Sequence, residues 1–207
     1  MKIAISVGDI NGVGLEILLK NHKKISKLCT PIYCIDKSLL QKAAKLLCLK
    51  MPKDILCISP NVEIPNITPA QITPQSGAYS YASFLLAIKL TQEKNSKALV
   101  TLPIHKKAWQ LANIPYAGHT EAFRDIFKKE AIMMLGSPKL YVALFTDHIP
   151  LKKVPPKISQ ESLTSFLLAL APHIHKTPCG VLGLNPHAGD FGVLGNEEKI
   201  IKNAIDY

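Results

Sequence analysis

The chain has 207 residues, of which 47% are hydrophobic and 19% charged, a balance that excludes a disordered or fibrous protein. The formal net charge is +10, but the basic residues are lysines with Arg124 as the only arginine. Because arginine is the usual reader of bases and phosphates in nucleic acids, we expect no nucleic-acid partner.

Short apolar runs alternate with helical patterns along most of the chain, which predicts the α/β fold class with a largely parallel sheet. The expected strands are 3–7, 32–35, 55–58, 98–102, 131–134, 140–145 and 180–184. The expected helices are 12–21, 38–49, 76–91, 104–111, 120–128, 160–171 and 197–206. In the helix 76–91, one face with Tyr81, Leu85 and Ile88 is expected to pack on the core. Residues 60–75 are rich in proline and predict a long irregular connection.

Cysteine usage and the N-terminus indicate the compartment. The five cysteines form no CxxC pair, and most have apolar neighbours, so we expect buried free thiols. The apolar run before Asp9 is too short for a signal peptide, and no stretch approaches the roughly 20 apolar residues of a membrane span. A cytoplasmic protein with no membrane partner is therefore expected.

A glycine-rich turn, Gly8-Asp9-Ile10-Asn11-Gly12-Val13-Gly14, follows the first expected strand and opens a helix. Its spacing fits neither the dinucleotide fingerprint nor the phosphate loop. Two interpretations remain open at this point. The turn is either a tight strand-to-helix connection, or a loop that contacts a ligand through Asp9 or Asn11.

Two further loops combine a strand end or a glycine with the start of a helix. Lys106 follows the strand 98–102 and is a candidate for proton transfer or anion binding, with a solvated lysine as the equal alternative. His119 and Thr120 follow Gly118 at the start of the helix 120–128, where free backbone amides favour an anionic ligand.

Two histidines follow expected strands and have acidic neighbours. His148 follows the strand 140–145 beside Asp147, and His187 follows the strand 180–184 near Asp190. If these strands are parallel neighbours, their carboxyl ends share one edge and the histidines converge, which predicts a divalent metal site. His22, His173 and His175 are instead expected on solvated helical surface.

Several motifs in order resemble a known family. GDINGVG, PIHK, GHTEAF, MMLG, FTDHIPL and GLNPHAGDFGVLGNEE resemble segments of the 4-hydroxythreonine-4-phosphate dehydrogenases of pyridoxal phosphate biosynthesis, and the resemblance covers essentially the whole chain. It implies a fold like that of isocitrate and isopropylmalate dehydrogenases, with two α/β lobes, here 1–115 and the beginning of a second lobe at 116–207. It also implies a homodimer with shared active sites.

The same resemblance implies an NAD- or NADP-dependent oxidation and decarboxylation of 4-phosphooxy-L-threonine with a divalent metal such as Zn, Mg or Co. His119 and Thr120 match the substrate-binding pair, and His148 and His187 match two metal ligands. Lys106 and Asp147 are the candidate catalytic residues. Asn185 and Gly189 are the candidate cofactor contacts.

The last expected helix, 197–206, has a capping residue and acids at its start but no stop signal at its end. Because family members continue further, to a third metal histidine, we expect an N-terminal portion that is inactive when isolated. A phosphate-utilising acyltransferase and a binding protein with half a site are the alternatives, and the two histidines near acids favour the dehydrogenase.

Overall fold

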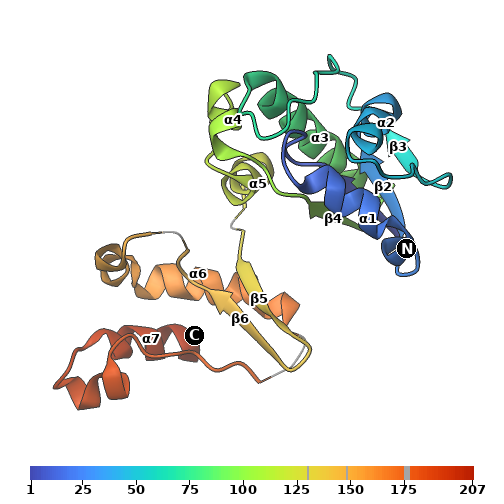
Figure 1. Ribbon diagram of the computed structural model, residues 1–207. Helices are drawn as coiled ribbons and strands as arrows, with labels where there is room; N and C mark the ends of the chain where they lie inside the picture. The colour runs from blue at the N-terminus through green and yellow to red at the C-terminus, as the bar shows by residue number, and fades with distance from the viewer. Residues whose placement is uncertain (130, 148, 175–177) are drawn as a thin grey trace. The chain divides into compact units, whose positions relative to one another are not determined.

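The computed structural model describes residues 1–129, 131–147, 149–174 and 178–207 (Figure 1). It divides into two compact units, Met1–Ala122 and Phe123–Tyr207. Each unit has its own cluster of buried apolar side chains.

The first unit is built on a parallel sheet. Its strands are β1 (Lys2–Ser6), β2 (Thr30–Cys34), β3 (Leu56–Ile58) and β4 (Ala98–Thr101), in the order β3-β2-β1-β4. All three strand pairs are parallel, which confirms the fold class predicted for this half of the chain. Its helices are α1 (Gly14–Ser26), α2 (Lys37–Leu46), α3 (Pro74–Gln92) and the short α4 (Lys106–Leu111).

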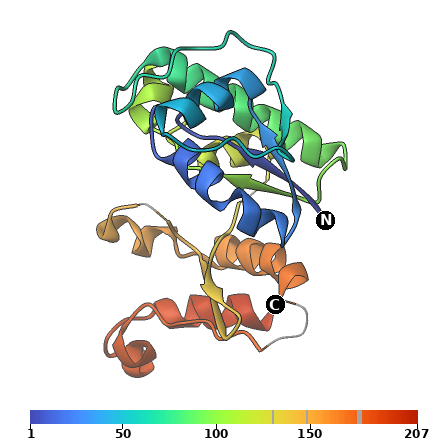
Figure 2. The ribbon, with the colours of Figure 1, turned by 45° about the vertical axis from the view of Figure 1, so that its right-hand side comes forward.

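Helices cover both faces of this sheet (Figures 1 and 2). Side chains alternate along a strand, so neighbouring residues enter different cores. Ile5 and Tyr33 pack with the buried leucines of α1 and α2, whereas Ala4 packs with Ala87 of α3. The sheet therefore lies between α1 and α2 on one side and α3 on the other.

The buried face of α3 includes Ile88, as expected, but not Leu85. Leu85 is 40% exposed, whereas Gly77, Ser80, Ser83 and Ala87 are buried. These small side chains let the helix approach the strands closely, and a buried hydroxyl can bond to the strand backbone. Ser83 Oγ donates to the Cys34 carbonyl at 2.6 Å and accepts the Val7 N–H at 3.0 Å.

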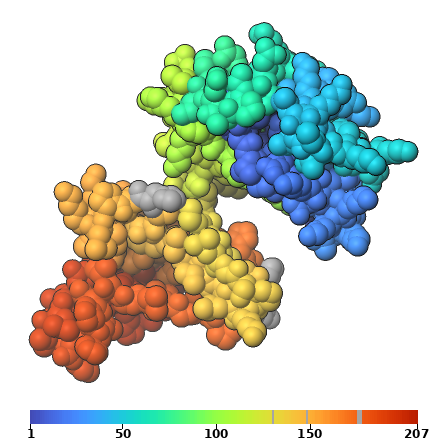
Figure 3. Space-filling model, in the orientation of Figure 1, coloured from blue at the N-terminus to red at the C-terminus, as the bar shows by residue number. Residues whose placement is uncertain are grey.

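The second unit contains an antiparallel hairpin of β5 (Met133–Ser137) and β6 (Leu140–Leu144). Helices α6 (Gln160–Leu170) and α7 (Glu197–Asp206) pack through Leu163, Ile201 and Ala204. Helix α5 (His119–Phe127) spans the division between the units. The hairpin, yellow in Figure 3, contributes to the surface of this unit, with Leu135, Leu140 and Tyr141 exposed. Short 3-10 turns complete the unit: η1 (Leu151–Lys153), η2 (Pro155–Lys157), η3 (Ala171–His173) and η4 (Pro186–Gly192).

Two expectations for the second unit were wrong. Residues 180–184 form no strand, and β6 pairs with β5 in antiparallel fashion and not with a parallel neighbour. A strand needs a partner for its backbone groups, and Leu182 in this segment is 86% exposed. The parallel strand ends that were expected to bring His148 and His187 together are therefore not found among the described residues.

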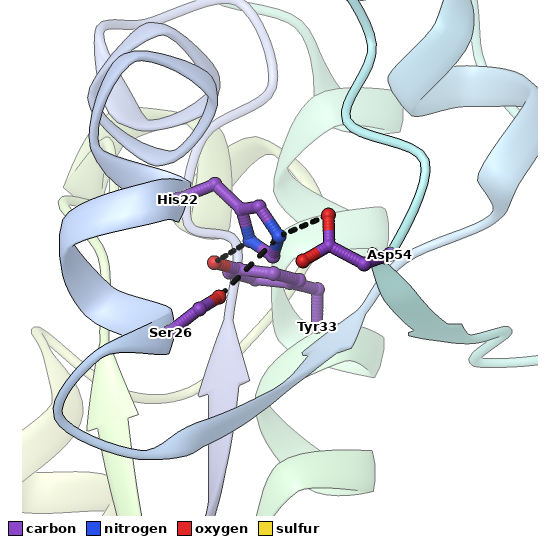
Figure 4. A network of polar contacts seen from close by, with 4 residues as sticks. All are labelled: His22, Ser26, Tyr33 and Asp54. Carbon is purple, nitrogen blue, oxygen red and sulfur yellow. Dashed lines mark hydrogen bonds and ion pairs between the residues drawn. The ribbon is translucent and has the colours of Figure 1, made fainter.

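His22 was expected on solvated surface but is buried in the first unit, which corrects that prediction. Figure 4 shows its ring between Tyr33, Asp54 and Ser26. Its Nδ1 lies 3.0 Å from the Tyr33 hydroxyl, and its Nε2 lies 3.3 Å from Asp54 Oδ1. Burial raises the pKa of Tyr33 well above its ordinary value, so the hydroxyl stays protonated and is hydrogen-bonded to Nδ1 as a neutral group. His22 thus joins α1, β2 and the turn before β3.

The cysteines are free, as expected, but they are not all buried. Burial raises the pKa of the Cys34 thiol to about 12, so this thiol is unreactive at neutral pH. Cys48 and Cys179 are exposed, which corrects the expectation for those two. Among the described residues, no helix combines the length and apolar character needed to cross a membrane.

Candidate functional site

The loops after β1 and β4 meet at one edge of the parallel sheet. The strand order is β3-β2-β1-β4, so the chain builds outward from β1 to β3 and then returns to add β4 on the other side of β1. Ligands of open α/β sheets bind outside the carboxyl ends of the strands at such a topological switch point. Asp9 N–H donates to the Pro103 carbonyl at 2.8 Å. Gly8 has φ +66° and a Cβ there would lie 2.1 Å from the Pro103 oxygen, so only glycine allows this approach.

Asn11 holds the long irregular connection in place. Its Oδ1 accepts the Thr68 N–H at 2.8 Å, and its Nδ2 donates to the Gln71 carbonyl at 3.0 Å. Asp9 Oδ1 in turn accepts the Asn11 N–H at 3.1 Å. Of the two interpretations of the glycine-rich turn, these contacts favour a structural connection for Asn11.

Lys106 and the Gly118-His119 loop lie next to each other in the first unit. A Cβ on Gly118 would be 3.9 Å from Cε of Lys106. The Lys106 side chain is exposed, so the partly dry surroundings considered from the sequence are not present around it in this unit. The structure therefore brings the PIHK and GHT motifs together at the sheet edge.

His119 begins α5 among aromatic rings. Its ring centroid lies 4.9 Å from that of Phe84 and 5.4 Å from that of Trp109. Burial lowers the pKa of His119 to about 4, so the imidazole is neutral at physiological pH. Its Nε2 is buried and has no hydrogen-bond partner in the part of the chain that the structure describes. The half-buried Thr120 follows it in the first turn of the helix.

Asp147 lies in the second unit, paired with the only arginine of the chain. Arg124 donates through one terminal nitrogen to Asp147 Oδ1 and to the Ala131 carbonyl, both at 3.2 Å. The Asp147 side chain is only 13% exposed. Its neighbour His148, a predicted metal ligand, lies outside the described residues.

Asn185 connects its loop to the start of α7. Its backbone N–H donates to Glu198 Oε1 at 2.8 Å, and its Nδ2 donates to Glu197 at 2.8 Å and Glu198 at 3.0 Å. The hydrogen bond from the Asn185 backbone is the main cause that holds the pKa of Glu198 below its usual value. For Glu197, its own backbone N–H is the main cause of a lowered pKa.

His187 and Gly189 lie in η4, where the backbone is left-handed from His187 to Phe191. His187 is exposed with φ 53°, and a Cβ on Gly189 would lie 2.7 Å from Glu198 Oε2. Within the described residues, no three His, Cys, Asp or Glu side chains are grouped to hold a metal ion. Because a catalytic divalent metal usually needs three protein ligands, these residues do not by themselves fit a complete metal site.

The prediction from sequence missed Trp109 and Arg124 as parts of these sites. Trp109 is completely buried against His119, and Arg124 pairs with Asp147. Each is the only residue of its type in the chain, which was the one available signal.

Taken together, the open parallel sheet with chemistry-bearing loops at its switch point defines an α/β protein of the ligand-binding or enzymatic class. Residues 27–207 match the family model described as pyridoxal phosphate biosynthetic protein PdxA. The chain belongs to this family.

Individual relatives agree with the family match. The chain is 49% identical over 205 residues to a 4-hydroxythreonine-4-phosphate dehydrogenase from Sulfurimonas denitrificans. This match covers 99% of this chain and 66% of the relative. It is 45% identical over 239 residues to one from Campylobacter jejuni strain RM1221, covering 100% of this chain and 65% of the relative. The crystal structure of the enzyme from Klebsiella pneumoniae matches with a TM-score of 0.84 at 25% identity, over 99% of this chain and 70% of that one. The chain thus spans about two thirds of the length of the two sequence relatives.

Proposed function

We propose that this protein acts as a 4-hydroxythreonine-4-phosphate dehydrogenase in pyridoxal 5'-phosphate biosynthesis. The observation that carries the proposal is the position of the family's GHT motif, with neutral His119, beside Lys106 at the sheet edge. The match to relatives of that name supports it. The proposal includes a two-lobed fold like that of isocitrate dehydrogenase, with lobes 1–115 and 116–207. It also includes a homodimer with shared active sites and a cytoplasmic location, where NAD and NADP are supplied.

The proposed reaction oxidises the secondary alcohol of 4-phosphooxy-L-threonine. NAD or NADP supplies the acceptor for the hydride. The carboxylate of Asp147, or Lys106 in its neutral amine form, accepts the hydroxyl proton while the alcohol carbon gives up its hydride and becomes a ketone. The bond between the amine-bearing carbon and the carboxylate carbon then breaks and CO2 leaves. The electron pair passes into the new ketone as an enolate, and protonation of the amine-bearing carbon gives 3-amino-2-oxopropyl phosphate.

Binding roles follow the positions of the remaining residues. His119 and Thr120 bind the substrate at the start of α5, where free backbone N–H groups favour an anion. Asn185 and Gly189 contact the cofactor. The backbone N–H and the Nδ2 of Asn185 both donate to glutamates. Its Oδ1 accepts no hydrogen bond from the described residues, so this oxygen is available to a donor of the cofactor. His148 and His187 contribute to binding a divalent metal such as Zn, Mg or Co.

The test is the intact mass of the protein purified from its own cells, followed in the same sample by NADH or NADPH formation from 4-phosphooxy-L-threonine, with each divalent metal and with chelator. Production of 3-amino-2-oxopropyl phosphate in equal amount to reduced cofactor supports the proposal. Binding of the substrate without turnover, in a chain confirmed to end at Tyr207 in the cell, supports the binding-protein alternative. Phosphate-dependent acyl transfer without cofactor reduction would replace the dehydrogenase proposal.

A further inference from the structure

The surroundings of His119 are built by helices α3 and α4. A Cβ on Gly77 of α3 would lie 2.1 Å from the Ala108 carbonyl oxygen of α4. The two helix backbones are therefore in direct contact at this glycine, which no other residue type permits without a shift. The contact places the next residue of α4, Trp109, against α3.

Hydrogen bonds then fix the orientation of the Trp109 indole. Its Nε1–H donates to Ser80 Oγ at 2.6 Å, and Ser80 Oγ donates to the Gly77 carbonyl at 3.0 Å. The indole also packs on Tyr81, with ring centroids 5.3 Å apart. A completely buried side chain with these contacts has one available orientation.

Trp109 and Phe84 in turn enclose the imidazole of His119. The Trp109 and His119 rings meet edge to face at 84°, and the Phe84 ring is tilted at 54° to the imidazole. Trp109 and Phe84 also contact each other, with centroids 6.0 Å apart. The two rings bury Nε2 of His119 with no hydrogen-bond partner among the described residues.

From this geometry we propose that Trp109 and Phe84 are positioning residues for His119, holding its ring in one orientation and one tautomer at the start of α5. A buried N–H without a partner costs more than a buried lone pair, so the proton lies on Nδ1. A neutral imidazole held in this way donates one hydrogen bond from Nδ1 to the substrate. The proposal rests on the substrate-binding role proposed above for His119.

The charge state agrees with this geometry. Burial is the only cause that lowers the pKa of His119. Titratable groups on the elements that surround it are Lys106 of α4, which lies beside Gly118, Glu121 of α5, which accepts the Ala117 N–H, and Tyr81 of α3, which packs on Trp109. Removal of an enclosing ring would admit water and allow the imidazole to accept a proton nearer its ordinary pKa of 6.5.

The test combines the titration of His119, followed by NMR of the carbon-13-labelled imidazole in the full chain, with the affinity for 4-phosphooxy-L-threonine. The variants are Trp109→Leu, which removes the ring, and Trp109→Phe, which keeps a ring. Ser80→Ala removes only the indole hydrogen bond. Tyr33→Phe, which alters the buried His22 network in the same unit, is the control.

We expect Trp109→Leu to raise the midpoint of His119 by at least one pH unit and to weaken substrate binding about 10-fold. Trp109→Phe should restore most of both values, Ser80→Ala should lie between, and Tyr33→Phe should change neither. If Trp109→Leu does not fold, Ser80→Ala decides, because it removes only the indole hydrogen bond and retains the packing. An unchanged midpoint and unchanged affinity in Ser80→Ala then overturn the proposal.

The two proposals fail in different ways. An unchanged His119 midpoint in a folded Trp109→Leu variant overturns the positioning role even if the wild-type chain binds substrate. If the His119 midpoint shifts in Trp109→Leu but the wild-type chain binds no substrate, the substrate role of His119 is overturned, and the positioning proposal with it. The shift would then show only that Trp109 encloses the His119 imidazole.

Discussion

At the scale of single residues, the chain uses buried polar contacts where distant segments meet. His22 contacts Tyr33 and Asp54, which lie on different elements, and Asn11 bonds to the connection before α3. A buried polar group that loses its partner carries the full cost of its lost hydration. These contacts therefore contribute to stability through the penalty for breaking them.

His22→Ala should lower the free energy of unfolding by about 2 kcal/mol, because the buried Tyr33 hydroxyl loses its partner and a cavity remains. The Asp54 contact contributes little to this loss, since that side chain is 75% exposed. Urea denaturation measures the change. Lys23→Ala, at the exposed neighbouring position, is the matched control and should change stability by less than about 0.5 kcal/mol. Equal losses in the two variants would contradict the structural role of His22.

The carboxylates that hold Asn185 should respond to acid. Hydrogen bonds to the ionised forms lower the pKa values of Glu197 and Glu198 from the ordinary 4.5. Because the pKa is lowered on folding, these hydrogen bonds contribute fully to stability above about pH 4.5. Their contribution is lost as pH falls through the lower pKa of the folded state.

The measurement is the NMR shift of the Asn185 backbone amide between pH 6 and pH 2, in wild type and in Glu198→Gln. We expect an acid transition below pH 4.5 in wild type that is reduced in the glutamine variant, which keeps an acceptor but cannot titrate. An identical transition in both chains would show that Glu198 does not hold the loop.

At the scale of elements, the contact between α3 and α4 positions the side chains of the candidate site in the first unit. Gly77→Ala places a methyl group against a backbone oxygen, and backbone cannot move as a side chain can. We expect a loss of about 1–3 kcal/mol in stability by overpacking. We also expect a raised His119 midpoint, because α4 carries Trp109 away from the imidazole.

Gly180→Ala is the matched control for this substitution. Nothing lies within 4 Å of a Cβ at Gly180, so thermal unfolding should be nearly unchanged there. If Gly77→Ala is as stable as Gly180→Ala and leaves the His119 titration unchanged, the close helix contact does not position the site.

At the scale of the whole molecule, local patterns predicted some features and not others. The strands and loops around Asp9 and Pro103 were predictable because a buried parallel strand is a short apolar run and a tight turn needs glycine. The segment 180–184 has the same apolar pattern but no partner strand among the described residues. An apolar run alone does not supply the partner that makes a strand.

The burial of His22 and the enclosure of His119 could not be predicted for a related reason. The partners of His22 come from β2 and from the turn before β3, and those of His119 come from α3 and α4. Such contacts depend on how helices cross the sheet, which a periodic pattern does not specify. The small-residue face of α3 was missed likewise, because serine and glycine at helical spacing carry no hydrophobic signal.

We propose above all that the loop edge of the parallel sheet in the first unit binds the phosphorylated substrate through His119. The most direct measurement is the NMR signal of each histidine in the full chain as 4-phosphooxy-L-threonine is added at pH 7. We predict a saturable shift of the His119 signal with no change at the buried His22. A saturable shift of other histidines with His119 unchanged, or turnover with His119 unaffected, would contradict the claim.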